Sequence, residues 1–134
     1  MPELPEVETS RRGIEPFLVG ERIDNITIRE KRLRWPVHAD VAKQLAGQTV
    51  DSVTRRAKYL LINTGNGSAM IHLGMSGSVY IVDHGTPATV HEHFDFTLGS
   101  GKTLRYRDPR RFGSLHWTRN PEPVSYTHLR AHET

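Results

Sequence analysis

The sequence predicts a mainly β domain, an antiparallel two-sheet β-sandwich of seven to eight strands flanked by two α-helices. Short runs rich in β-branched and aromatic residues follow one another from residue 49 to residue 118. Glycine-rich turns at 65–67 and 99–101 separate neighbouring runs. Helical spacing of apolar residues occurs only before these runs, so we expect the helices to flank a sandwich or barrel.

The first helix is predicted over residues 5–15, directly after the start of the chain. Pro5 suits the first helical position, and Glu6 and Glu8 favour the positive end of the helix dipole. Pro16 is expected to bend or end the helix early, and Gly20 closes the segment. The apolar side is predicted to consist of Val7, Ile14, Phe17 and Leu18.

A second, shorter helix is predicted over residues 39–45, with Gly47 as its stop. In the run 93–98, three apolar residues alternate with His93, Asp95 and Thr97, which is typical of a half-buried strand. The strands are expected at 22–30, 49–54, 57–63, 68–73, 77–82, 93–98, 103–107 and 113–118.

Composition limits the kind of protein. The 134 residues suffice for one domain, and a net charge of +3 permits a polyanionic partner. Basic residues gather at 29–34, 55–58 and 105–111, each a solvated face or a phosphate-binding patch. The chain has no cysteine, which excludes disulfides and thiolate chemistry. No run is long enough to span a membrane and no secretory signal is recognisable, so we expect a cytoplasmic protein with no membrane partner.

The last residues do not continue the strand pattern. Residues 125–129, Ser-Tyr-Thr-His-Leu, can be back-translated into the end of a transposase-based sequencing adapter, and the remaining residues continue it in frame. We therefore expect one domain over 1–123 and a non-native tail over 124–134. His128 and His132 then carry no weight as metal ligands.

The chain start combines an amine with a carboxylate. Removal of Met1 would expose the secondary amine of Pro2, and an α-amine ionises near ~7.7–8.0, so part of it is unprotonated at neutral pH. Such an amine attacks aldehydic carbons to give an imine, and Glu3 can move the protons that this reaction requires. While Met1 remains attached, the Pro2 nitrogen is a tertiary amide and cannot react.

Three further stretches place phosphate-binding groups beside apolar ones. Lys58 stands at the entrance to an apolar strand, where a lysine either binds phosphate or only protects an edge. Glycines flank Met75 and favour a sharp turn that pushes its side chain outward. Arg110 and Phe112 share a loop bounded by proline and glycine, and such a pair suits insertion into a duplex.

Four motifs in this order resemble the bacterial formamidopyrimidine-DNA glycosylases, over roughly residues 1–120. They are Pro2-Glu3-Leu4-Pro5-Glu6-Val7-Glu8-Thr9, Arg55-Arg56-Ala57-Lys58-Tyr59-Leu60-Leu61, His72-Leu73-Gly74-Met75-Ser76-Gly77 and Asp108-Pro109-Arg110-Arg111-Phe112-Gly113. The resemblance implies base excision repair: excision of oxidised purines such as 8-oxoguanine and formamidopyrimidines, followed by β,δ-elimination.

The resemblance also implies roles for single residues. Pro2 becomes the nucleophile at the sugar C1′, Glu3 the acid/base that protonates the ring oxygen, and Glu6 a supporting carboxylate. Lys58 becomes both catalytic and phosphate-binding. The DNA-contact set is His72 on phosphates, Met75, Arg110 and Phe112 in the gap left by the flipped base, with His91 and Arg111 as backbone contacts.

Family members have a second half with a helix–two-turn–helix element and a four-cysteine zinc finger, which is missing here. The resemblance therefore implies one zinc ion in that missing half, and no metal or other cofactor in this chain. The implied partner is double-stranded DNA with oxidised purines or abasic sites, bound by a monomer. Without half of the phosphate contacts, we expect weak binding and little activity.

Three alternatives remain open. An endonuclease VIII-like enzyme shares the N-terminal Pro-Glu and prefers oxidised pyrimidines, although Leu4 and the loop at 110–112 weigh against it. A non-catalytic DNA-binding β-sandwich would keep the residues that insert into the duplex but would not catalyse base excision. A basic sandwich with no nucleic-acid role is the third.

Overall fold

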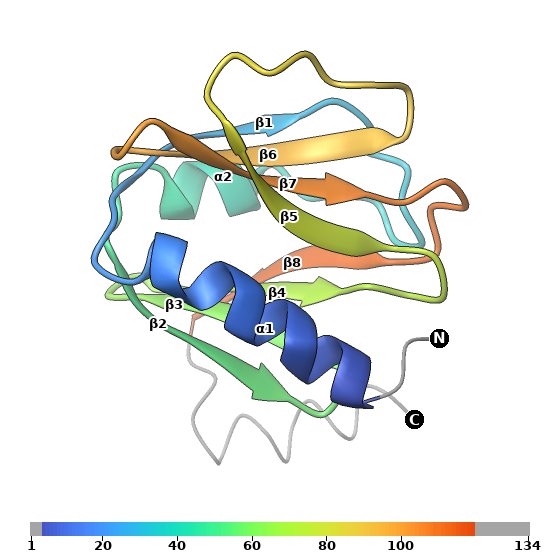
Figure 1. Cartoon of the computed structure of the whole chain (residues 1–134), viewed down its shortest axis with the longest axis horizontal. Coiled ribbons are helices and arrows are strands. Elements are labelled where there is room, and N and C mark those ends of the chain that lie inside the picture. Colours follow the sequence, from blue (N-terminus) through green and yellow to red (C-terminus); the bar gives the residue numbers. More distant parts are fainter. Residues whose placement is uncertain (1–3, 120–134) are drawn as a thin grey trace.

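The computed structural model describes residues 4–119 and shows two four-stranded antiparallel sheets that face each other (Figure 1). The first sheet has the order β1-β6-β7-β5 and the second the order β2-β3-β4-β8. The predicted sandwich with two helices is confirmed. The strands are β1 (Ile23–Ile28), β2 (Val50–Arg56), β3 (Tyr59–Thr64), β4 (Gly67–His72), β5 (Ser78–Asp83), β6 (Glu92–Leu98), β7 (Lys102–Arg107) and β8 (Ser114–Thr118).

Aromatic and aliphatic side chains from both sheets fill the space between them. Phe94 and Tyr106 stack with ring centroids 4.7 Å apart, and both rings are fully buried. Leu60, Ile62 and Ile71 from the second sheet belong to the same core cluster and are equally buried. Burial of each such side chain contributes about 1.5–3 kcal/mol, so this cluster is the main source of stability.

The two helices cover the open sides of the sandwich. Helix α1 (Leu4–Leu18) packs on β2 and β5, which are edge strands of the two sheets. Helix α2 (Asp40–Leu45) packs on β1, β4 and β8 at the opposite side (Figure 1). Each helix therefore closes the core where the sheets leave a gap. Within residues 4–119, neither helix is long and apolar enough to cross a bilayer.

Helix α1 differs from the prediction at its C-terminal end. It continues through Pro16 to Leu18, because Ile14 and Leu18 are buried one turn apart and their packing outweighs the hydrogen bond that Pro16 cannot donate. Phe17 does not join the apolar side and is 44% exposed. At 3.6 residues per turn, the Phe17 side chain points roughly 80° around the helix axis from the mean direction of Ile14 and Leu18.

Strand β6 also differs, since its polar face is buried and not exposed. The segment 84–91 crosses over this face (Figure 1), and Asp95 and Arg105 beneath it are only 7% and 4% exposed. Arg105 donates to Asp95 through Nε (3.0 Å) and Nη2 (3.1 Å). It also donates to the carbonyls of Thr86 (2.8 Å) and Pro87 (3.2 Å), which fixes the segment over the sheet.

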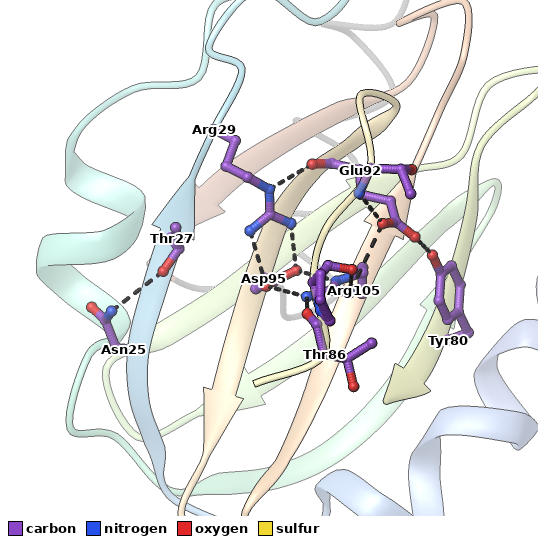
Figure 2. Close-up of polar contacts among 10 residues, drawn as sticks. Asn25, Thr27, Arg29, Tyr80, Thr86, Glu92, Asp95 and Arg105 are labelled. Atoms are coloured by element: carbon purple, nitrogen blue, oxygen red, sulfur yellow. Dashed lines mark hydrogen bonds and ion pairs between the residues drawn. The ribbon is translucent and has the colours of Figure 1, made fainter. Parts of the chain in front are cut away.

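Further groups complete this buried network (Figure 2). Arg29 at the end of β1 makes a two-pronged ion pair with Asp95, at 3.0 and 2.7 Å, and Tyr80 donates to the Glu92 carboxylate. Burial alone raises the pKa of Asp95, but the hydrogen bonds from Arg29 and Arg105 outweigh it and hold that pKa below its usual value. The carboxylate therefore stays ionised although water hardly reaches it.

Candidate nucleic-acid interface

Several stretches singled out in the sequence meet at one end of the sandwich. The start of α1, the β2–β3 turn, the β4–β5 connection and the β7–β8 connection all lie at the right-hand end of Figure 1. We call residues 73–77 and 108–113, which form the last two connections, the rim loops. Residues far apart in the sequence thus share one surface.

The start of α1 is tied to this end through Glu8. Its carboxylate accepts hydrogen bonds from Arg11 at 2.6 Å and Arg12 at 2.8 Å, and pairs with Arg55 of β2 at 3.4 Å. Hydrogen bonding to Arg11 first, and then to Arg12, lowers the pKa of Glu8 to about 2 despite some opposing desolvation. The pair with Arg55 holds the first turns of α1 against strand β2.

The predicted reactive residues precede this helix. Pro2 and Glu3 lie outside the described residues, and α1 begins at Leu4, the next residue. Glu6 is exposed in the first turn of the helix.

Lys58 lies at the tip of the β2–β3 hairpin and is exposed. Arg56 pairs with Tyr59, so Ala57 and Lys58 form the turn between the strands. Ala57 has a φ of 52°, in the left-handed region, and its carbonyl accepts a hydrogen bond from Arg55 at 3.2 Å. The strand predicted over 57–63 therefore begins two residues late, because the chain must reverse there.

His72 ends strand β4 beside this hairpin. Its ring is half-buried, meets Tyr59 edge-on at 5.2 Å, and accepts a hydrogen bond at Nδ1 from the Gly74 amide at 3.1 Å. This arrangement leaves Nε2 as the donor of the neutral ring. Burial, followed by the positive charges of Lys58 and Arg34, lowers the pKa of His72. An anion bound here would reverse the charge effect.

The rim loops present two large apolar side chains to solvent. Met75 is 66% exposed and Phe112 is 43% exposed, and the guanidinium carbon of Arg110 lies 5.8 Å from the centre of the Phe112 ring. The loops touch each other: a Cβ added to Gly74 would lie 2.8 Å from the carbonyl carbon of Phe112. The structure thus brings together the three residues predicted to fill the gap of a flipped base.

The two predicted backbone contacts are placed differently. Arg111, with a φ of 58°, pairs with Glu30 at 3.3 Å, and Glu30 also binds Arg32 at 3.0 Å. Hydrogen bonds from Arg32 contribute most to lowering the pKa of Glu30 to about 2. His91 is half-buried at the end of the segment 84–91, and its carbonyl accepts from the amide of Asp108 at 2.9 Å.

The sequence predicted the basic run 29–34 as a possible phosphate-binding patch, but it did not assign this run or Trp35 to this surface. An open groove of about 590 Å³ runs between the second rim loop and the connection from β1 to α2. The Arg34 amide donates to the Gly113 carbonyl at 3.0 Å, and the Arg34 guanidinium lies 5.7 Å from the exposed Trp35 ring. A basic run that ends in tryptophan was the available signal. The groove is lined by Arg32, Arg34, Trp35, Arg110, Arg111 and Phe112.

Exposed apolar residues between arginines, on the rim of a rigid sandwich, define the class of domain that suits insertion into a base stack. Sequence comparison agrees with this class. A profile of the formamidopyrimidine-DNA glycosylase N-terminal domain matches residues 1–115. The chain belongs to the formamidopyrimidine-DNA glycosylase family.

Relatives and solved structures support the assignment. The formamidopyrimidine-DNA glycosylases of Stutzerimonas stutzeri and of Pseudomonas aeruginosa strain LESB58 are each 56% identical over 121 residues, which is 90% of this chain. The chain spans about half the length of these relatives, 45% in both cases.

Solved structures of the enzyme from Lactococcus lactis are among the matches. Its formamidopyrimidine-DNA glycosylase, non-covalently bound to DNA with an abasic site, matches with a TM-score of 0.85 and 30% identity, over 96% of this chain and 50% of that one. A complex of the same enzyme with DNA containing N7-benzyl-Fapy-dG matches with a TM-score of 0.86 and 31% identity, over 96% and 48%.

A zinc ion does not fit the residues present. The sequence has no cysteine, and residues 4–119 bring no three His, Asp or Glu side chains together as metal ligands.

Proposed function

We propose that this chain is the N-terminal catalytic domain, residues 1–123, of a DNA glycosylase/AP lyase that removes oxidised purines in base excision repair. The observation that carries the proposal is that the β2–β3 turn with Lys58, the end of β4 with His72 and the rim loops meet at the end of the sandwich where α1 begins. The DNA substrate, the Pro2 nucleophile and the side chains that insert into the duplex would then share one surface. The partner is double-stranded DNA that contains oxidised purines or abasic sites.

The proposed chemistry uses the first residues of the processed chain. The Pro2 amine attacks C1′ of the damaged nucleotide, the base leaves, and Glu3 protonates the ring oxygen as the sugar opens to the imine. Loss of a C2′ proton expels the 3′ phosphate, and a second elimination expels the 5′ phosphate. Glu6 supports Glu3. Glu3 directly follows Pro2 in the sequence, so it suits the proton transfers that general acid–base catalysis requires.

The remaining residues would bind and hold the DNA. Lys58 and the Nε2–H of His72 suit the phosphates around the flipped nucleotide. Met75, Arg110 and Phe112 suit the void in the duplex, and filling it offsets the few kcal/mol that flipping costs. His91 and Arg111 are proposed as weaker backbone contacts.

The proposal includes a second half that would bind the other side of the duplex and hold one zinc ion. Residues 124–134, which lie outside the described residues, are proposed to be a non-native tail. We propose a monomer in the bacterial cytosol, and weak DNA binding by the 134-residue chain alone, because phosphate contacts provide most of the salt-dependent affinity.

Borohydride trapping tests the chemistry. A chain whose N-terminus is shown by mass spectrometry to be Pro2 should form a covalent adduct with abasic-site DNA after reduction. We expect the adduct to be lost in Pro2→Gly. We also expect it to be lost when Met1 is retained, because the Pro2 nitrogen is then an amide and cannot form an imine. A processed chain that binds DNA but never forms the adduct would be a non-catalytic binding module.

A panel of lesions tests the substrate class. One solved structure of the Lactococcus lactis enzyme holds DNA with an oxidised pyrimidine, so both lesion classes belong in the panel. The measurement uses this domain joined to the second half of a close relative. Faster release of 8-oxoguanine than of oxidised pyrimidines supports the proposal, and the reverse order supports the endonuclease VIII-like alternative.

A further inference from the structure

Asp108 has no assigned role in the proposed reaction, yet its carboxylate is the best-connected group at the rim. The residue is fully buried. Oδ1 accepts a hydrogen bond from the Ser76 hydroxyl at 2.5 Å, and Oδ2 accepts from the Tyr106 hydroxyl at 2.6 Å and from the Gly113 amide at 2.8 Å. One side chain is thereby bonded to both rim loops and to strand β7.

The positions of these donors are informative. Ser76 directly follows Met75, and Gly113 directly follows Phe112, so the carboxylate holds the neighbour of each exposed apolar residue. The Ser76 contact joins residues 32 positions apart, and no strand pairing connects the two loops there. Asp108 therefore adds a direct bond between the two loops, beyond the strand pairs His72–Ser114 and Ser78–Arg107 that hold their ends.

Close packing beneath the loops allows little adjustment. A Cβ on Gly113 would overlap the Tyr106 hydroxyl and the His72 carbonyl, and one on Gly77 would overlap the Leu73 carbonyl. The backbones thus approach as closely as glycine permits. Little room is left beside Gly77 and Gly113 for either loop to move inward, so we expect a change in the bonds of Asp108 to shift a rim loop.

A buried carboxylate is costly unless it is fully hydrogen-bonded, so its presence beside solvent-exposed loops needs a reason. Desolvation raises the pKa of Asp108, but hydrogen bonds from Ser76, Tyr106 and the Gly113 and Arg111 amides outweigh it and lower that pKa. The group is thus an anion that collects donors from separate segments. Exposed Met75 and Phe112 have no core packing of their own to hold them apart.

We propose that Asp108 is a positioning residue that couples the two rim loops, so that Met75 and Phe112 are held at the separation needed to enter one gap in a base stack. The coupling is a property of the free protein. Its use on DNA rests on the proposed function.

Ser76→Ala tests the coupling with the least disturbance, since it removes one hydroxyl from one loop. Ser78→Ala is the matched control, because Ser78 is an exposed serine two residues further on. Backbone amide shifts and heteronuclear relaxation are measured by NMR on the 134-residue chain without DNA. Ser76→Ala should shift and loosen Phe112 and Gly113 as well as residues 74–77, whereas the control should change only its own surroundings.

The coupling is overturned if Ser76→Ala alters residues 73–78 and leaves 110–113 unchanged. Asp108→Asn is the second variant: it keeps the shape but places an NH₂ group against one of the donors, and should disturb both loops at once. If this variant unfolds, the Ser76→Ala spectrum still decides the matter.

A binding measurement tests the use of the coupling. Affinities are compared for a duplex with a tetrahydrofuran abasic analogue and for the same intact duplex. Ser76→Ala should weaken the abasic complex about tenfold, the value of one hydrogen bond to a charged group, and the intact complex by less than about twofold. Equal loss on both duplexes, or none, overturns the positioning role. Because the 134-residue chain alone is expected to bind weakly, a chain that binds neither duplex is replaced in this comparison by the same domain joined to the second half of a close relative. Failure of that joined protein to bind would count against the proposed function, while the NMR result would still decide the coupling.

Discussion

Replacing Arg105 with methionine should destabilise the domain strongly, because this arginine is the buried cation that holds the segment 84–91. Its guanidinium binds Asp95 and the carbonyls of Thr86 and Pro87, and the residue is 4% exposed. Methionine has a similar length but donates no hydrogen bond. Three acceptors would therefore lose a donor where water hardly reaches them.

The expected loss of stability depends on the ion pair that Asp95 keeps. Removing one partner of a buried ion pair costs about 3–5 kcal/mol. Asp95 would keep Arg29, whose two terminal nitrogens lie 3.0 and 2.7 Å from its oxygens, which places the expected cost near the lower end, at about 3 kcal/mol. Single domains are stable by about 5–15 kcal/mol, so we expect the variant to fold.

Urea unfolding, followed by circular dichroism at pH 7, measures this cost. With a slope of about 2 kcal/mol per molar urea, the midpoint should fall by about 1.5 M. Arg22→Met is the control: the Arg22 side chain is 64% exposed and pairs with Asp24 at 2.7 Å, and such surface pairs contribute less than about 1 kcal/mol. A midpoint for Arg105→Met no lower than that of the control would refute the stabilising role of the buried network.

Three further outcomes are expected. The folded-state pKa of Asp108 lies below its unfolded value near ~3.9. The contribution of its carboxylate to stability is therefore complete above that pH and is lost as the pH falls through the folded pKa. In Asp108→Asn, which lacks this carboxylate, the urea midpoint should fall less steeply below about pH 4. The NMR signals of the His72 ring should titrate with a pKa below ~6.5 in the free chain. Lys58→Met should raise this pKa by removing a nearby positive charge. An unchanged pKa would contradict the effect of Lys58 on His72. Gly113→Ala should lower the free energy of unfolding, measured in urea, by about 1–3 kcal/mol or more. The control Gly65→Ala should lower it by less than about 0.5 kcal/mol, because an added Cβ there meets nothing within 4 Å. Equal losses would show that the rim loops can relax.

The fold could be predicted from the sequence because its strands are marked locally. Apolar residues alternate along 93–98, glycines mark the turns, and the strand limits follow within a few residues. The strand order could not be predicted in this way. Strand β5 pairs with β7 and not with β6, its neighbour in the chain, because the segment 84–91 crosses the face of the sheet.

Burial of polar residues was the main failure of the sequence prediction. Asp95 and Arg105 occupy alternate positions of their strands and resemble solvent-facing residues, but the segment 84–91 covers them. Asp108 similarly reads as a polar loop residue, and only the fold brings Ser76 to it. No local pattern records a partner that lies 32 residues away.

The exposed positions of the site were predictable for the opposite reason. Met75 and Phe112 are flanked by glycine or arginine in short loops, and such local chemistry pushes an apolar side chain outward without help from distant residues. Trp35 was missed since its exposure depends on the connection 29–39 lying beside the second rim loop, where the Arg34 amide binds the Gly113 carbonyl.

Asp95 and Asp108 both contribute to holding the segment 84–91 in place. Asp95, through Arg105, holds the segment 84–91 at residues 86 and 87, while the Asp108 amide binds the His91 carbonyl at the far end of that segment. His93 adds a bond from its Nε2 to the Asp108 carbonyl at 2.7 Å. A surface that inserts apolar side chains into DNA must keep them in water beforehand, so it cannot be ordered by packing those side chains into a core. Buried, directional hydrogen bonds behind the loops provide that order instead, because they fix the backbone while Met75 and Phe112 stay exposed.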